Sequence, residues 1–384
     1  MTMLSPKPSP IRVLVIDIVS PIRDALVATL ETAVGIEVVG VGAESKDALR
    51  LTQRLRPDVI AMGTLALGPN GLQAIRHIMR TVPTSIIVMA MPRDLMPKEG
   101  TGHMTQNDID YAFEALRAGA LTVVNEPVPS NRATYTELID AVRLMAEVPV
   151  IHHWDRGAQA AQVRAVQTGT ASQRRESLSP EVWAEKQQHI EIIGIAASTG
   201  GPAAMTVLLR NLPAEFPLPI VLVQHVTHGF GDGLTKWLNS QTPLHVRIAC
   251  DGEQPQAGTV LISPDDYHLQ LNRLGKIELN REQPYKGLRP SANFLFRSMA
   301  CAYGPRAMGI VLTGMGDDGV EGLTQLHQVG GLTIAQDEQS SVVYGMPYEA
   351  VTRRAVDRVL ALEQIALLLG QLRRAQRLPA LAVN

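Results

Sequence analysis

The stretch IIGIAASTGGP, residues 192–202, determines how the second half of the chain folds. Six apolar or small residues lead without a break into a serine, a threonine, two glycines and a proline. Such a continuous apolar run is typical of a strand buried in a parallel sheet. Glycines permit a tight turn, and proline suits the first turn of a helix. The stretch therefore predicts a strand, a turn that carries Ser198, and a helix.

The same alternation of short apolar runs and amphipathic, helix-length segments recurs along both halves of the chain. In the first half, strands are expected at Val13–Ile16, Ile36–Val41, Val59–Met62, Ile86–Met89 and Leu121–Val124, and helices at Pro21–Thr32, Asp47–Arg56, Gly71–Thr81, Ile109–Ala118 and Thr134–Ala146. In the second half, strands are expected at Ile192–Ala197, Ile220–Val223, Val260–Ile262, Met308–Leu312 and Leu332–Ala335, and helices at Ala203–Leu212, Leu234–Asn239, Ala292–Ala302 and Val320–Val329. Alternating leucines and an isoleucine around Gly275 predict a hairpin within Gly258–Leu279. This pattern predicts an α/β protein with two doubly wound parallel sheets and a small antiparallel addition.

Apolar periodicity stops between about residues 150 and 188, where Gln, Ser, Thr, Arg and Ala dominate. Such a composition favours a solvated linker or a marginal helix. We therefore expect a receiver-like domain over residues 11–147, a linker over 148–188 and a catalytic domain over 189–372. The basic pair at 174–175 is interpreted as solvated charge.

Composition excludes several classes of function. The 384 residues carry a net charge of −2, so no whole-chain field for nucleic acid or an anionic membrane is expected. The two cysteines, Cys250 and Cys301, have no paired spacing, which argues for a reducing compartment and against a disulfide or zinc framework. No apolar run approaches the ~20 residues that span a bilayer. The proline-rich N-terminus lacks a signal-peptide core, and a cytoplasmic protein is predicted.

Ser198 is the first candidate for chemistry, because a strand-to-helix turn lies beneath free backbone N–H groups. A serine there more commonly caps the helix. A phosphate cradle is a second alternative, although the P-loop lysine and the dinucleotide glycine spacing are both missing. A serine nucleophile also needs a base. His225 ends the next strand through Gln224 and so reaches the same sheet edge, with His228 as its rival. The remaining strand and hairpin histidines, His245 and His268, are interpreted as surface or structural residues.

A glycine-rich loop, LTGMGDDG at residues 312–319, follows another strand and supplies two acids. Its glycines, Gly316 among them, would let backbone approach a reacting centre, although an Asp-Gly turn is also a common structural feature. An aspartate here could orient the imidazole, and backbone N–H groups near Thr199 or Met315 could bind an oxyanion. The order Ser, His, Asp and the lack of a Gly-x-Ser-x-Gly frame indicate convergent chemistry on a fold other than that of the α/β-hydrolases. No metal or cofactor is expected.

These residues resemble the CheB family of chemotaxis protein-glutamate methylesterases. The matching segments, in the family's order, are Ile193–Pro202, Val223–His225, Leu288–Ser291, Leu312–Gly319 and Tyr344–Pro347. Gln224–Val226 and Ala335–Asp337 are most similar to the Wsp-type, surface-signalling branch.

The resemblance implies specific roles. Ser198 would be the nucleophile, His225 the base, and Asp318 rather than Asp317 the orienting acid, with Met315 in the oxyanion-side loop. The family demethylates glutamate methyl esters, and some members deamidate glutamines, on the cytoplasmic helices of methyl-accepting chemoreceptors. Chemosensory kinases and adaptor proteins would be further partners.

The family also carries an N-terminal phospho-receiver domain, and here the first half departs from the pattern. A receiver needs an acidic pair after its first strand to hold Mg²⁺, but this chain has Asp17 followed by Ile18. Its phospho-accepting aspartate should follow the third strand, where Gly63 stands. Asp58 is no substitute, because it precedes that strand.

Two further receiver positions have changed. A hydroxyl is required after the fourth strand, where Ala90 and Met91 stand. A lysine is required before the proline of the last loop, where Glu126 reverses the charge. The first domain is therefore predicted to be a pseudo-receiver that keeps the fold without the phosphoryl chemistry.

Two alternatives remain for the function of the whole chain. A non-catalytic signalling adaptor is one, and the joint presence of Ser198, His225 and Asp318 argues against it. A serine hydrolase for another ester is the other, and it differs only in its substrate.

Overall fold

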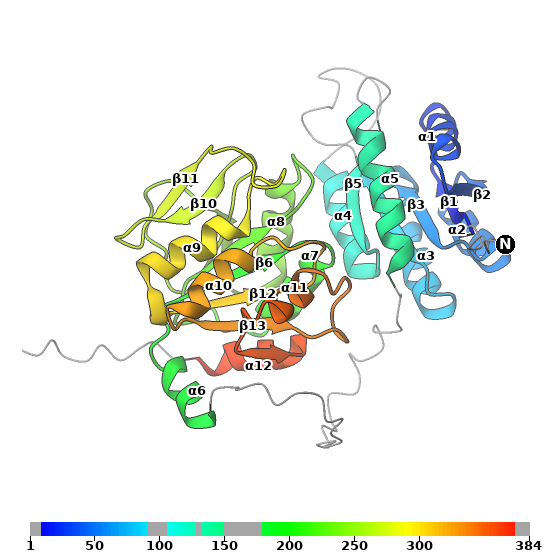
Figure 1. Ribbon diagram of the computed structural model, residues 1–384. Helices are drawn as coiled ribbons and strands as arrows, with labels where there is room; N and C mark the ends of the chain where they lie inside the picture. The colour runs from blue at the N-terminus through cyan, green and yellow to red at the C-terminus, as the bar shows by residue number, and fades with distance from the viewer. Residues whose placement is uncertain (1–8, 91–105, 128–131, 149–178, 373–384) are drawn as a thin grey trace, which may run out of the picture. The chain divides into compact units, whose positions relative to one another are not determined.

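The computed structural model describes residues 9–90, 106–127, 132–148 and 179–372 (Figure 1). The chain divides into two compact units, Met1–Gln167 and Thr168–Asn384. Within the described residues, no helix is both long and apolar enough to cross a membrane.

The first unit is a five-stranded parallel sheet with helices on both faces. Its strands are β1 (Ile11–Ile16), β2 (Ile36–Gly42), β3 (Val59–Gly63), β4 (Ser85–Ala90) and β5 (Thr122–Asn125), in the order β2-β1-β3-β4-β5. Helices α1 (Ser20–Thr32) and α5 (Arg132–Glu147) pack on one face, and α2 (Ser45–Leu55), α3 (Gly68–Thr81) and α4 (Gln106–Ala118) on the other. Strands β3 and β4 are buried throughout, which explains their continuous apolar sequences.

The second unit is built on a seven-stranded sheet in which every pair of neighbours is parallel. Its strands are β6 (Ile192–Ala197), β7 (Ile220–Gln224), β8 (His245–Ile248), β9 (Thr259–Ile262), β12 (Ala307–Val311), β13 (Leu332–Gln336) and β14 (Arg358–Leu360). They lie in the order β14-β13-β12-β6-β7-β9-β8. The chain runs from β6 to β7 on one side and returns later to β12 on the other. The carboxyl end of β6 is therefore the switch point of the sheet, where ligand crevices form in open α/β folds.

Two layers of helices and a hairpin complete the second unit. Helices α7 (Gly201–Leu209), α8 (Gly231–Gln241) and α12 (Leu362–Gln371) form one layer, and α9 (Ala292–Ala302), α10 (Val320–Gln328) and α11 (Met346–Thr352) form the other. The antiparallel hairpin of β10 (His268–Leu271) and β11 (Ile277–Asn280) packs against α9. The expected fold class is thus confirmed, including the small antiparallel addition.

The structure also contains elements that were not expected from the sequence. Strands β8 and β14 are edge strands of four and three residues, too short to give an apolar run. Strand β9, which matches the strand expected at Val260–Ile262, pairs in the main sheet, and within the expected hairpin region only β10 and β11 form the hairpin.

The C-terminal part of the stretch expected as a linker or marginal helix contains a short helix. Residues Pro180–Gln187 form helix α6, with the Ser179 side chain accepting a hydrogen bond from the Val182 N–H at 3.4 Å. Trp183 is buried beneath the guanidinium of Arg358, and the Lys186 ammonium donates to the Gly330 carbonyl at 3.0 Å. A single buried tryptophan anchors this short helix to the second unit, and one buried apolar residue gives no periodicity to detect. Residues 149–178 of the expected linker, which include the basic pair, lie outside the described residues.

Candidate active site

Ser198 lies at the carboxyl end of β6, in a turn held on both sides by backbone hydrogen bonds. Its N–H donates to the Thr313 carbonyl at 3.0 Å, and its carbonyl accepts from the Gly201 N–H at 2.8 Å. Gly200 adopts a left-handed conformation with φ of 79°, which favours glycine, and α7 begins at the next residue. A side chain at Gly314 would also come within 2.7 Å of the Ser198 Cβ. The glycines are therefore required for the strand, the turn and the neighbouring loop to meet at the serine.

Gln224 joins the ends of β6 and β7 and was assigned no role from the sequence. It is buried, and its amide nitrogen donates to the Ser198 carbonyl at 2.8 Å and to the His225 carbonyl at 2.9 Å. These bonds fix the backbone of both residues relative to each other. A glutamine that ends an apolar strand was the available signal, because a buried amide needs hydrogen-bond partners.

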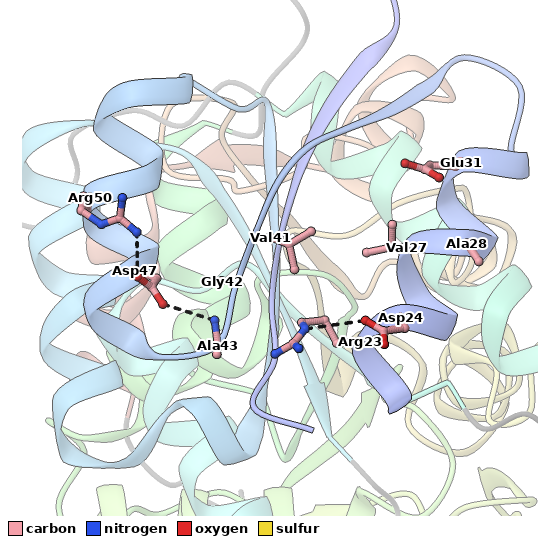
Figure 2. Close-up of a pocket in the computed structure, with 10 residues that line it drawn as sticks. All are labelled: Arg23, Asp24, Val27, Ala28, Glu31, Val41, Gly42, Ala43, Asp47 and Arg50. Carbon is pink, nitrogen blue, oxygen red and sulfur yellow. Dashed lines mark hydrogen bonds and ion pairs between the residues drawn. The ribbon is translucent and has the colours of Figure 1, made fainter. Parts of the chain in front are cut away.

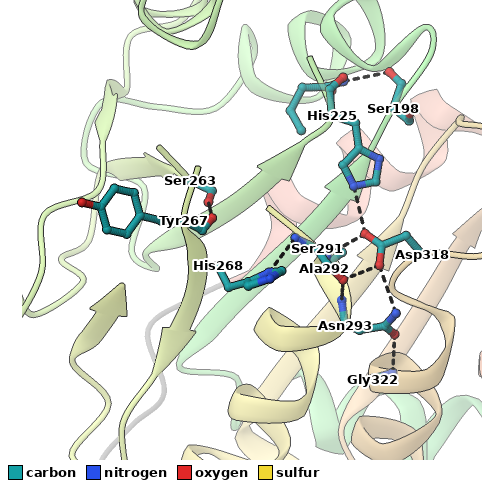
Figure 3. Close-up of polar contacts among 11 residues, drawn as sticks. Ser198, His225, Ser263, Tyr267, His268, Ser291, Ala292, Asn293, Asp318 and Gly322 are labelled. Atoms are coloured by element: carbon teal, nitrogen blue, oxygen red, sulfur yellow. Dashed lines mark hydrogen bonds and ion pairs between the residues drawn. The ribbon is translucent and has the colours of Figure 1, made fainter. Parts of the chain in front are cut away.

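His225 and Asp318 form a direct hydrogen-bonded pair. The His225 Nε2 lies 2.9 Å from the Asp318 Oδ2, and both side chains are largely buried. Figure 3 shows the imidazole between Ser198 and Asp318. A carboxylate can only accept, so the Nε2 carries a proton, and in the neutral imidazole the lone pair then lies on the Nδ1. This tautomer leaves one ring nitrogen available as a proton acceptor.

Three consecutive residues at the start of α9 hold the Asp318 carboxylate. Its Oδ1 accepts from the Ser291 hydroxyl at 2.5 Å and from the Asn293 amide at 3.0 Å, and its Oδ2 accepts from the Ala292 N–H at 2.7 Å. Burial raises the pKa of Asp318, but hydrogen bonds and charge from His225, Ser291 and Ala292 outweigh it, so the pKa lies below its ordinary value. The carboxylate is therefore ionised and fixed in orientation.

Asp317, the adjacent acid, has a different environment. Its carboxylate accepts from the Lys286 ammonium at 2.6 Å and from the Arg353 guanidinium at 2.9 Å. The hydrogen bond from Lys286 is the main cause that lowers the pKa of Asp317. The structure thus brings Asp318, and not Asp317, to the imidazole.

The rival base, His228, pairs with other acids. Its Nδ1 lies 3.7 Å from the Asp266 carboxylate and 3.9 Å from that of Asp265, and its side chain is 61% exposed. Among the other histidines, His245 is exposed, whereas His268 is fully buried and so is not a surface residue.

The candidate oxyanion residues lie in the serine turn and in the loop after β12. The Thr313 hydroxyl donates to the Thr199 carbonyl at 2.9 Å, which ties the loop after β12 to the serine turn. Within residues 179–372, the N–H groups of Thr199, Gly200, Met315 and Gly316 donate to no other group. The Met315 side chain is 57% exposed, and Gly316 has a φ of 83°. Both turns therefore offer backbone donors at the edge of the sheet that carries Ser198.

The altered receiver positions lie together at the carboxyl edge of the first unit's sheet. Asp17 is buried after β1, and Gly63 ends β3. A Cβ at Gly63 would overlap the Asp17 Oδ2, so the Asp17 carboxyl already fills the space that a side chain at Gly63 would need. Burial raises the pKa of Asp17, although a hydrogen bond from the Val19 N–H and the charge of Arg23 oppose it.

The other positions follow the same layout. Glu126 is buried after β5, with its N–H donating to the Ala90 carbonyl at 2.9 Å. Ile18 is 51% exposed, and Met91 lies outside the described residues. Asp58 lies at the opposite end of the sheet, where its carboxylate accepts from the Arg12 N–H at 2.8 Å at the start of β1.

An open groove of the first unit lies beside these positions without including them. It runs between α1, the end of β2 and the start of α2 (Figure 2). Ion pairs flank it, from Arg23 to Asp24 at 4.0 Å and from Arg50 to Asp47 at 2.8 Å, around an apolar floor that includes Val41. Its lining contains no residue singled out from the sequence.

Comparison with known proteins places the chain in a family. The model of the CheB methylesterase family matches residues 193–369. A "Protein-glutamate methylesterase/protein-glutamine glutaminase 4" of Myxococcus xanthus is 40% identical over 365 residues, which cover 94% of this chain and 96% of the relative. A protein of Nitrosospira multiformis named protein-glutamate methylesterase/protein-glutamine glutaminase is 36% identical, with 94% and 97% covered. The CheB methylesterase catalytic domain of Thermotoga maritima is 37% identical over 48% of this chain and 99% of that domain, with a TM-score of 0.46. With relatives at this identity over almost their whole length, the chain belongs to the CheB methylesterase family.

Proposed function

We propose that this protein hydrolyses glutamate methyl esters, and deamidates glutamines, on the cytoplasmic helices of chemoreceptors, with Ser198 as nucleophile. The observation that carries the proposal is the buried pair of His225 and Asp318 at the strand edge that also presents Ser198. The names of the full-length relatives support the same reaction. Residues 189–372 would form the catalytic domain.

The reaction follows from the tautomer of His225. Its Nδ1 takes the proton of the Ser198 hydroxyl as the oxygen attacks the ester carbonyl carbon, and the ionised Asp318 stabilises the imidazolium. The imidazolium then protonates the leaving methoxide, which departs as methanol and leaves an acyl-serine. Water, deprotonated by the same nitrogen, attacks this acyl group and releases the glutamate carboxylate. With a glutamine substrate the leaving group is ammonia.

Negative charge develops on the carbonyl oxygen during both attacks. The N–H groups of Thr199 in the serine turn and of Met315 and Gly316 in the facing loop are free to donate to it. Each well-aligned donor contributes about 3–4 kcal/mol to transition-state stability. These backbone donors need no metal ion or cofactor.

The test of this proposal is release of methanol from a methylated chemoreceptor cytoplasmic fragment. We expect release by the wild-type chain and loss of several powers of ten in rate for Ser198→Ala, with unchanged thermal stability. A variant that kept wild-type turnover would contradict the role of Ser198. Binding of the receptor fragment without any methanol release by the wild type would favour the adaptor alternative. Release from small esters but not from the fragment would favour another substrate.

We further propose that residues 11–147 form a pseudo-receiver that phosphoryl donors do not switch. Gly63 has no group that accepts a phosphoryl, and the Asp17 carboxyl fills the space beside it. The buried Glu126 places an acid where a lysine would hold the phosphate. A ligand that cannot bind one state better than another shifts no equilibrium.

Acetyl phosphate or beryllium fluoride in Mg²⁺ should therefore leave the methanol release rate of the full chain unchanged, and intact mass should show no phosphoryl adduct. Faster turnover with the donor would show that the first domain still responds to phosphate. Control of the enzyme would instead come from protein contacts, for which chemosensory kinases and adaptors are the candidates.

A further inference from the structure

His268 is a buried histidine that the proposed reaction does not use. It begins β10, is fully buried, and stacks on Phe294 with 3.8 Å between ring centroids. Both ring nitrogens have partners. Its Nε2 lies 3.2 Å from the Gln283 carbonyl oxygen. Its Nδ1 lies 3.2 Å from the Ser291 backbone nitrogen (Figure 3).

These partners leave only one protonation state. A backbone N–H can only donate and a carbonyl oxygen can only accept, so the Nδ1 holds a lone pair and the Nε2 carries the proton. His268 is therefore neutral. Its surroundings agree, because burial lowers the pKa of His268, and the opposing hydrogen bond to the Gln283 carbonyl and the charge of Glu282 do not reverse that shift.

The acceptor role of the Nδ1 links His268 to the catalytic acid. The Ser291 backbone N–H donates to the His268 Nδ1, and the Ser291 hydroxyl donates to the Asp318 Oδ1 at 2.5 Å. The next residue, Ala292, donates its N–H to the Oδ2 of the same carboxylate. A shift of the backbone at Ser291 would therefore move two of the four hydrogen bonds that orient Asp318, and through them His225.

We propose that neutral His268 is a positioning residue for the reaction, acting through Ser291 on Asp318. This inference rests on the proposed roles of Ser198, His225 and Asp318. Because His268 is fully buried and reaches Asp318 through Ser291, we expect its effect in the chemical step and not in substrate binding.

The experiment compares three full-length variants in the methanol-release assay. His268→Leu removes both polar contacts. His268→Asn can return an oxygen near the Nδ1 position, and His268→Gln places its amide nearer the Nε2 position, so it keeps the Gln283 contact and loses the acceptor for Ser291. We expect kcat to fall on the order of tenfold for Leu and Gln, with KM unchanged, and to recover for Asn.

Three results would overturn the proposal: wild-type kcat in Gln, equal losses of kcat in Asn and Gln, or a loss expressed in KM alone. Thermal melts of each variant identify those that fold, and the Asn–Gln pair decides the question should Leu not fold. Failure of the proposed function would be seen separately, as absence of methanol release by the wild type or as full release by Ser198→Ala.

Discussion

Replacement of Asp318 by asparagine is the most informative perturbation of the site, because it keeps the shape of the side chain and removes its charge. The carboxylate accepts four hydrogen bonds, from His225, Ser291, Ala292 and Asn293. An amide has one acceptor oxygen and a donating nitrogen. If the amide nitrogen of the new asparagine points toward His225, the imidazole Nε2 must accept its hydrogen bond. The imidazole proton then lies on Nδ1, which can no longer accept the proton of Ser198. With the nitrogen toward Asn293, two amide groups face each other as donors.

Either orientation also removes the negative charge that stabilises the imidazolium. We therefore expect kcat to fall by about 10³- to 10⁴-fold, as for tautomer-disrupting changes in other triads. Donors left unpaired in this buried site should also lower the free energy of unfolding by ~1–3 kcal/mol each. The matched control is Asp317→Asn, which disturbs only the ion pairs with Lys286 and Arg353 at the surface and should change kcat little. Methanol release measures both variants, and a larger loss for Asp317→Asn than for Asp318→Asn would refute the reasoning.

Three other outcomes are expected. His225→Ala should abolish methanol release, whereas His228→Ala disturbs only an exposed ion pair and should retain most of the activity. The opposite ranking in the same assay would assign the role of base to His228. Gly63→Ala should lower the free energy of unfolding by about 1–3 kcal/mol, because the methyl group of the alanine would overlap the Asp17 carboxyl. An unchanged midpoint of denaturant unfolding of the full chain would contradict this packing. Because folding lowers the pKa of Asp318, its charge should stabilise the fold fully above the unfolded-state pKa of about 3.9, and this stabilisation should disappear as the pH falls through the lower folded-state pKa. Thermal melts of the wild type and of Asp318→Asn should therefore converge in strong acid.

The fold and the three proposed catalytic residues could be predicted from sequence for one physical reason. In a parallel sheet every strand ends at the same edge, so residues that follow β6, β7 and β12 are brought together whatever their separation in the chain. Periodicity found those strands because they are buried on both faces. It missed β8 and β14, whose edge positions need no apolar run.

The groups that orient these residues could not be predicted in the same way. Asn293 and Ser291 reach Asp318 from 25 and 27 residues away, through a segment whose position depends on how α9 packs. No local pattern distinguishes an Asp-Gly pair in a turn from one whose carboxylate has four donors. The choice between Asp317 and Asp318 therefore came from the family resemblance, and the structure supplies its physical basis.

The carboxyl edges of the two sheets give a buried carboxylate different surroundings. This difference supports the proposal that the first domain is a pseudo-receiver and the second is catalytic. Asp318 is surrounded by donors, which keep its pKa low and its charge fixed next to His225. The Asp17 Oδ2 meets no donor among the described residues, and burial raises the pKa of Asp17, so this edge stabilises the ionised carboxylate less than the edge that holds Asp318 does. A phosphoryl group also needs an acceptor at the end of β3, whereas here the Asp17 carboxyl fills the space beside Gly63 and Glu126 adds a second acid in place of a lysine. Donors fix the carboxylate next to His225 at one edge, whereas the other edge lacks an acceptor at Gly63, which is why we expect the esterase rate to be independent of phosphoryl donors.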